Sequence, residues 1–293
     1  MNGIIVVNKP QNFTSFDAVA IMRGCFHTKK VGHSGTLDPM ATGVLPIFIG
    51  GATKAVSLLP ESGKSYRAGF RLGVTSETLD IWGDCSEQKN VSVSEKTLLT
   101  VLEKFKGDIE QVPPMYSALK VNGQKLCDLA RKGIEVERKP RKVTISRLEL
   151  TEFDGRDGII EVDCSSGTYI RTLADDIGAA LGTGAVMTSL VRTRACGFSL
   201  AESSPLEELK TKPAEELERL LKPVDSVFAE YPKIVLDETQ RLLYFNGVRL
   251  DAKRLHDNAC EGLCRVYGAE FIGLAEIVGG ELISVKRLTD LSS

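Results

Sequence analysis

The chain has 293 residues, of which 42% are hydrophobic and 26% charged, and its formal net charge is −2. This balance is typical of a globular protein with one large domain or two unequal ones. It argues against helices that span a membrane, because no apolar run approaches the ~20 residues needed to cross a bilayer. The near-neutral charge gives no indication of a nucleic-acid partner, so any basic surface must be local.

The seven cysteines and three histidines argue against a metal site. The cysteines are scattered, and only Cys260 and Cys264 lie close together, without a second pair to complete a zinc site. Cysteines of this kind, with no recognisable signal peptide, predict a cytoplasmic protein. No glycine-rich nucleotide fingerprint occurs, so no cofactor is expected. Every apolar stripe has an intramolecular use, which predicts a monomer that requires no protein partner. The lack of a long apolar run predicts that no membrane is involved.

Hydrophobic periodicity predicts an α+β fold. Apolar or alternating runs predict strands at residues 4–7, 44–49, 66–72, 143–153 and 159–164, the last two joined as a hairpin. Helical spacing predicts helices after Thr14-Ser15 (carrying Phe16, Val19, Ala20 and Met22), over 98–105, from 170 to Gly182 and over the acidic stretch 205–222. Because these elements do not alternate as βαβ units, we expect a mixed, largely antiparallel central sheet flanked by helices.

The C-terminal part has a different pattern. Beyond a boundary near residues 223–232, short strands are predicted at 263–267, 271–278 and 282–287, with glycines between them. Such short strands predict a small β barrel. The run from Phe271 to Leu282 resembles a PUA module, an RNA-binding barrel. We therefore expect a catalytic domain at 1–230 and a PUA-like domain at 231–293.

Residues 32–46 form a glycine-rich loop around one carboxylate, Asp38. Gly35 and Gly43 allow tight turns and the close approach of a large ligand, and Pro39 fixes the backbone directly after the acid. An acid on a rigid loop with small polar neighbours is how a nucleophile is presented. The alternative is that Asp38 is the N-cap of a short helix, since Asp-Pro is a common helix start.

This loop resembles the first signature of the TruB family, the pseudouridine synthases that act on the T-loop of tRNA. The resemblance implies that Asp38 is the catalytic nucleophile. Further segments match the family pattern in order, so that it covers residues 3 to about 200. These segments contain Asn8-Lys9-Pro10, Lys64-Ser65-Tyr66-Arg67, the stretch 167–172 and the stretch 184–193.

The resemblance implies roles for single residues in these segments. Tyr66 would lie against the face of the flipped-out uracil, and it is a candidate proton acceptor at C5. Arg171 would pair with Asp38, oppose the rise in its pKa on burial and aim its oxygen. Leu190 would pack beside the target base, and His33 would insert into the T-loop.

The residues alone leave structural alternatives open. Tyr66 would be a core tyrosine, His33 a simple loop histidine, and Arg171 would form a weak i,i+4 surface pair with Asp175. Lys9 would be a solvated lysine at a strand end. The resemblance instead makes the segment around Lys9 a support for the catalytic loop, with Lys9 among the residues that bind substrate.

A local basic segment supplies the charge that the whole chain lacks. Residues 112–147 carry nine lysines and arginines against three acids. A basic run is usually a solvated face, but phosphate binding requires such a concentration. The resemblance makes residues from about 111 to 142 an insertion that clamps RNA, with Lys120, Arg131 and Arg141 as contacts.

Two positions depart from the family pattern. The family commonly has Tyr where this chain has Cys127 and a second Arg where it has Val191. These departures affect RNA contacts and not the chemistry. The insertion, together with the sequence of residues 40–43, favours the bacterial stand-alone enzyme over its guide-RNA-dependent archaeal and eukaryotic relatives.

The expected function is therefore a tRNA pseudouridine synthase that isomerises uridine 55 in the T-loop, with the T-arm of tRNA as its partner and no cofactor. One alternative is an RNA-binding or RNA-folding module in which catalysis is secondary or absent. Another is the same isomerisation on a different RNA. Substitution of Asp38 separates the first alternative from the enzyme.

Overall fold

A computed structural model describes residues 2–88, 91–255 and 260–288. Its main body is built on a ten-stranded sheet, counted over the described residues, with the order β14-β1-β3-β12-β4-β11-β10-β7; β2 pairs with β3 and β13 with β12. The strands are β1 (Gly3–Lys9), β2 (Val31–His33), β3 (Thr42–Ile49), β4 (Lys64–Leu72), β7 (Gly107–Gln111), β10 (Arg141–Phe153), β11 (Asp157–Cys164), β12 (Ala185–Ala195), β13 (Phe198–Ser199) and β14 (Ser204–Pro205).

The sheet is mixed and largely antiparallel, as predicted. Only the β1–β14 and β3–β12 pairs of this sheet, among the described residues, run parallel. The predicted hairpin forms between β10 and β11. The periodicity missed β12, which lies at the centre and pairs with both β3 and β4. Strand β12 carries arginines and threonines among its apolar residues, so its sequence has no clean alternation.

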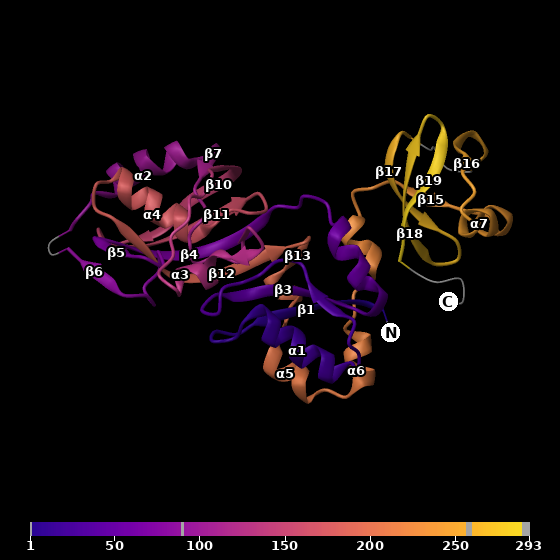
Figure 1. Cartoon of the computed structure of the whole chain (residues 1–293), viewed down its shortest axis with the longest axis horizontal. Coiled ribbons are helices and arrows are strands. Elements are labelled where there is room, and N and C mark those ends of the chain that lie inside the picture. The colour runs from indigo at the N-terminus through magenta and orange to yellow at the C-terminus, as the bar shows by residue number, and fades with distance from the viewer. Residues whose placement is uncertain (1, 89–90, 256–259, 289–293) are drawn as a thin grey trace.

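Helices cover the sheet in two groups (Figure 1). In one, α2 (Glu95–Leu102) and α4 (Ile170–Ala180) contact each other, and α4 packs on β4 and β12. In the other, α1 (Ser15–Cys25), α5 (Leu206–Thr211) and α6 (Ala214–Arg219) lie beside the β1 end of the sheet. Further short elements are β5 (Val74–Ser76), β6 (Cys85–Glu87), β8 (Lys120–Val121), β9 (Gln124–Lys125), α3 (Leu126–Ala130) and the 3-10 turns η1 (Gly50–Leu58), η2 (Glu103–Phe105), η3 (Leu200–Glu202), η4 (Val224–Phe228) and η5 (Ala252–Arg254).

Two helix predictions need correction. The first helix begins as expected, because Thr14 and Asp17 form a capping box. Its buried face, however, consists of Ser15, Ala18, Val19 and Met22. Phe16 is 63% exposed, with Arg23 over its ring. The acidic stretch 205–222 is not one helix but two, because Pro213 cannot continue α5 and instead precedes α6.

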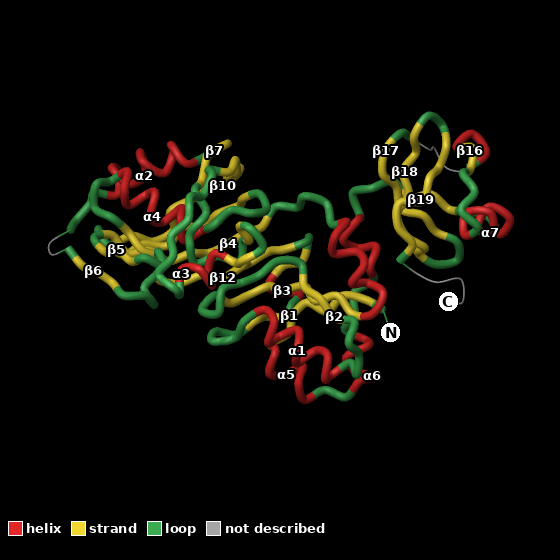
Figure 2. Tube along the Cα trace, viewed as in Figure 1, coloured by secondary structure: helices red, strands yellow, loops and turns green. Residues whose placement is uncertain are grey.

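A separate five-stranded sheet with the order β15-β17-β18-β19-β16 forms the C-terminal part (Figure 2). Its elements are β15 (Lys233–Val235), α7 (Glu238–Phe245), β16 (Leu250–Asp251), β17 (Gly262–Tyr267), β18 (Phe271–Val278) and β19 (Glu281–Arg287). The three predicted strands are present, whereas α7 and the flanking strands were not foreseen. This sheet has its own buried cluster, and Leu274 and Phe271 also pack against the main body beside Phe228.

Across the described ranges, no helix has the length and hydropathy to cross a membrane.

Candidate active site

The Asp38 loop connects β2 and β3 at the surface of the main sheet. The Ala41 N–H donates to the Asp38 carbonyl at 3.1 Å, which closes a turn. No helix follows this turn, because residue 42 already begins β3. The alternative that Asp38 caps a helix is therefore wrong, and its carboxylate is available for other partners. Its side chain is 39% exposed.

Lys9 supports the Asp38 loop through hydrogen bonds to backbone carbonyls. The residue is 0% exposed. Its Nζ donates to the carbonyls of Phe13 at 2.6 Å, Pro10 at 2.9 Å and Pro39 at 3.2 Å. The acceptor on Pro39 lies one residue after Asp38. Lys9 is therefore not a solvated lysine, and the prediction that it binds substrate is corrected, because three backbone carbonyls already enclose its ammonium group.

Arg171 makes a two-point contact with Asp38. Its Nε lies 3.0 Å from Oδ2 and its Nη2 lies 3.3 Å from Oδ1. The guanidinium also donates to the carbonyls of Thr78 at 3.0 Å and Tyr116 at 2.9 Å. Arg171 is 5% exposed, at the start of α4. The alternative surface pair with Asp175 does not form among the described residues, since the buried guanidinium is committed to other acceptors.

Asp80 is a member of this group that the sequence analysis missed. Its Oδ2 lies 3.6 Å from Nη1 of Arg171, and its side chain is 14% exposed. Thr78 Oγ1 and the Trp82 N–H donate to Oδ1 at 2.7 and 3.2 Å. Two carboxylates thus share one buried guanidinium. The position of Asp80 between β5 and β6 follows from tertiary structure, and no local pattern marks it.

These surroundings act on the ionisation of Asp38 in opposite directions. Burial raises the pKa of the Asp38 carboxyl above its ordinary value of 3.8, and the charge of Asp80 raises it further. The guanidinium of Arg171 and, more weakly, the ammonium of Lys9 lower that pKa. The net effect is a raised pKa, and Arg171 opposes that rise by favouring the ionised carboxylate.

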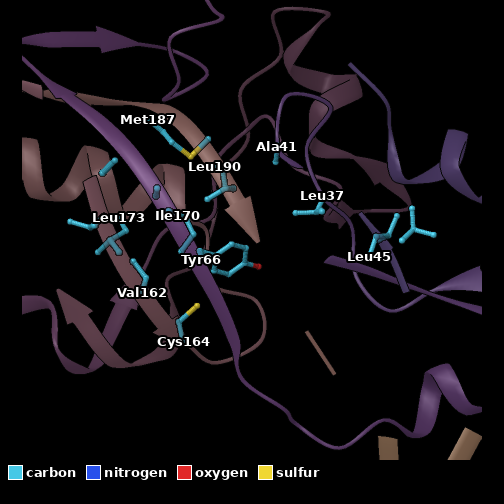
Figure 3. Close-up of a cluster of buried hydrophobic side chains, with 14 of the residues drawn as sticks. Leu37, Ala41, Leu45, Tyr66, Val162, Cys164, Ile170, Leu173, Met187 and Leu190 are labelled. Atoms are coloured by element: carbon cyan, nitrogen blue, oxygen red, sulfur yellow. The ribbon is translucent and has the colours of Figure 1, made fainter. Parts of the chain in front are cut away.

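Tyr66 and Leu190 lie on neighbouring strands at the edge of the core cluster (Figure 3). Both are nearly buried, at 8% and 7% exposure. Figure 3 shows the Tyr66 ring directed from β4 toward the side of the cluster where Leu37 and Ala41 of the Asp38 loop lie. Burial raises the pKa of Tyr66 to about 12. Tyr66 is therefore a neutral phenol at pH 7, which suits an aromatic platform better than a proton acceptor.

His33 ends β2, five residues before Asp38, and is half-buried. Its Nδ1 accepts the Gly35 N–H at 3.2 Å, and burial lowers the pKa of the imidazole. The neutral ring thus presents its other nitrogen as a donor.

The residues predicted to contact RNA lie outside the network of hydrogen bonds and ion pairs around Asp38. Lys120, Arg131 and Arg141 are all exposed, and within the described ranges none pairs with Asp38. Lys120 begins β8 and Arg141 begins β10. The segment nevertheless reaches the site through Tyr116, whose carbonyl accepts from Arg171. The described residues contain no group of three or more His, Cys, Asp or Glu side chains that could hold a metal ion.

Comparison with known sequences identifies the family. Residues 23–170 match the TruB family pseudouridylate synthase N-terminal domain, and residues 171–229 match the tRNA pseudouridylate synthase B C-terminal domain. The chain belongs to the TruB family. The junction between the two matches lies inside one structural unit, because β12 pairs with β3 and β4 from the N-terminal match.

Relatives and solved structures agree with this assignment. The chain is 44% identical to the tRNA pseudouridine synthase B of Clostridium tetani (strain Massachusetts / E88), over 94% of this chain and 96% of that protein. It is 43% identical to the protein of that name from Pseudomonas fluorescens (strain Pf0-1), over 98% and 95%. A chain from the crystal structure of a Cbf5-Nop10-Gar1 complex matches with a TM-score of 0.75 at 27% identity, covering 98% of this chain and 85% of that chain. The bacterial TruB-type resemblance predicted from the motifs is confirmed.

Proposed function

We propose that this protein is a tRNA pseudouridine synthase that isomerises uridine 55 in the T-loop, with Asp38 as its nucleophile. The observation that carries the proposal is the two-point contact of Arg171 with the Asp38 carboxylate, in a chain 44% identical to a tRNA pseudouridine synthase B. The reaction breaks the bond from N1 to C1′, turns the uracil and joins C5 to C1′. A proton leaves C5 and one is gained at N1, so no redox partner is needed.

The proposed role of Asp38 depends on its charge. Attack on C1′, addition at C6 and a glycal route all require an ionised carboxylate beside the flipped nucleoside. Arg171 favours that ionised form and contacts both oxygens. Asp80 holds the far side of the guanidinium, so Arg171 cannot rotate away without losing a second partner.

The remaining residues would bind the substrate. Tyr66 and Leu190 would lie against the extruded base. Their contact would replace part of the stacking that the base loses on extrusion. The neutral His33 would enter the T-loop. Lys120, Arg131 and Arg141 would attract the phosphates of the T-arm.

The C-terminal sheet and the assembly complete the proposal. Residues 231–293 would form a PUA-like RNA-binding domain beside a catalytic domain at 1–230. The protein would act as a monomer, as expected from the intramolecular use of its apolar stripes. A tRNA substrate implies work in the cytoplasm.

The decisive experiment is pseudouridine formation in an unmodified tRNA transcript, mapped to the nucleotide, with wild type and Asp38→Asn compared. We expect product at position 55 with the wild type and a loss of ~10⁴-fold or more with Asp38→Asn, which keeps the shape but loses the nucleophile. tRNA binding should be retained. Equal activity of the two proteins would contradict the role of Asp38. Binding without product from the wild type would favour the RNA-binding alternative, and product at another site would favour a different target RNA.

A further inference from the structure

Arg192 is a buried cation that the proposed chemistry does not use. It is 1% exposed and heads the largest fully buried side chains of the protein. Among the described residues, no carboxylate lies within ion-pair distance of its guanidinium, in contrast to Arg171. A buried charge without a counter-ion is costly unless polar groups are fixed around it. Its surroundings should therefore explain why the protein places it there.

Three donor contacts of Arg192 go to backbone carbonyls that flank Asp38, and a further side-chain hydrogen bond joins Arg192 to Tyr66. Nε donates to Val44 at 2.7 Å, Nη2 to Gly35 at 3.2 Å and Nη1 to Thr36 at 3.4 Å. Two of the acceptors precede Asp38 in the chain and one follows it. One rigid group thus joins both arms of the loop, which a lysine with a single nitrogen does less well.

The backbone of Arg192 reinforces this contact. Strand β12 places Arg192 beside Gly43 in the parallel register with β3. Gly43 has a φ of +104°, and a Cβ there would collide with the Arg192 carbonyl oxygen. Glycine at this position is what permits the close approach of the loop to β12.

The charge of Arg192 also acts on Tyr66, which would contact the substrate. Arg192 lies opposite Tyr66 in the register of β12 and β4. Its guanidinium lowers the pKa of Tyr66, which burial raises. It also lowers the pKa of Lys9, in the same direction as burial. Arg192 therefore borders the loop, its lysine support and the aromatic platform at once.

We propose that Arg192 is a positioning residue for the isomerisation: its guanidinium clamps the backbone on both sides of Asp38 and so holds the carboxylate where Arg171 and the nucleoside meet it. The inference rests on the proposed function for its kinetic consequence. It differs from the role of Arg171, which contacts the reacting carboxylate itself.

The test compares Arg192→Met, Arg192→Lys and the control Arg194→Met. Arg194 lies on the same strand, is exposed, and donates to Ser65 Oγ at 3.1 Å. We measure the single-turnover rate at saturating tRNA transcript, the Kd for tRNA, and amide hydrogen exchange in residues 35–44 and 262–287. Because misplacement of a reacting group by about 1 Å costs ~100-fold in rate, we expect Arg192→Met to lose ~100-fold in rate with Kd within about threefold. Exchange should rise in 35–44 and not in 262–287.

Other results would overturn the proposal. A purely structural role predicts a lower melting temperature with an unchanged rate well below it, and Arg192→Met with a near-normal rate would establish that role. If Arg192→Met does not fold, Arg192→Lys decides: a loss of about tenfold in rate supports the clamp, and a rate equal to that of Arg194→Met contradicts it. If the wild type makes no pseudouridine, the proposed function fails, and the exchange data alone still decide whether Arg192 holds the loop.

Discussion

The cations around the Asp38 loop and those of the basic segment differ in burial and in the acceptors that their donor groups contact. Lys9, Arg171 and Arg192 are at most 5% exposed, and their donors contact backbone carbonyls, Tyr66 or the carboxylates of Asp38 and Asp80. The exposed Lys120, Arg131 and Arg141 are different. Arg131 has one exposed ion pair, to Asp128 at 3.6 Å, which contributes little. A buried cation with fixed acceptors sets geometry, whereas an exposed one keeps its charge available for phosphates.

Among the substitutions that test this difference, Arg171→Met has the largest expected effect on the rate. The substitution removes the two-point contact and leaves Asp38 without its main counter-charge. We expect the single-turnover rate to fall by ~10³-fold, the scale for loss of a preorganised electrostatic partner, with Kd for tRNA within about threefold. Because Arg171 lowers the pKa of Asp38, the acidic limb of the residual rate should move to higher pH.

The control for this variant is Arg67→Met, which removes an exposed arginine that pairs with Glu152 at 2.6 Å on the neighbouring part of the sheet. Its rate should stay near that of the wild type. A rate for Arg171→Met close to the control, or weakened tRNA binding with an unchanged rate, would place Arg171 with the exposed cations instead.

The opposite pattern is expected for the basic segment. Single substitutions of Lys120, Arg131 and Arg141 by Gln should raise Kd for tRNA several-fold each, with the rate at saturation unchanged. Each should also reduce the slope of log affinity against log salt by about 1. Filter binding between low and physiological salt measures both effects. Lys96→Gln on α2 is the matched control, and a slope that falls equally for Lys96→Gln would show a general charge effect rather than contact.

The same contrast explains what the sequence could predict. The Asp38 loop and the strands β1 and β3 beside it could be predicted from short local segments. The pairing with Arg171, 133 positions away in the chain, was predicted only from the family resemblance, and the structure contains that contact. Asp80 and Arg192 were missed because each owes its place to distant backbone: the strand register of β12 for Arg192, and the turn between β5 and β6 for Asp80. Lys9 was seen as a motif residue, but its burial under Pro39 depends on a contact 30 positions away in the chain.

The finest test concerns the two acids that share Arg171. Asp80 raises the pKa of Asp38, because a second negative charge disfavours ionisation of the first. Asp80→Asn removes that charge, so that Arg171 no longer divides its attraction between two carboxylates. Both changes lower the pKa of Asp38, so the acidic limb of the single-turnover rate should move to lower pH.

This shift is opposite in sign to that of Arg171→Met, which makes the pair of variants more informative than either alone. At pH 7 the rate of Asp80→Asn should fall by about tenfold, since Arg171 loses the acceptor that fixes its far side. The pH–rate profiles of wild type, Arg171→Met and Asp80→Asn, measured under single-turnover conditions, check both signs. Limbs that move in the same direction would mean that the acid titrating in the profile is not Asp38 paired with Arg171. Opposite movements would identify the ionised Asp38 carboxylate as the species on which the rate depends.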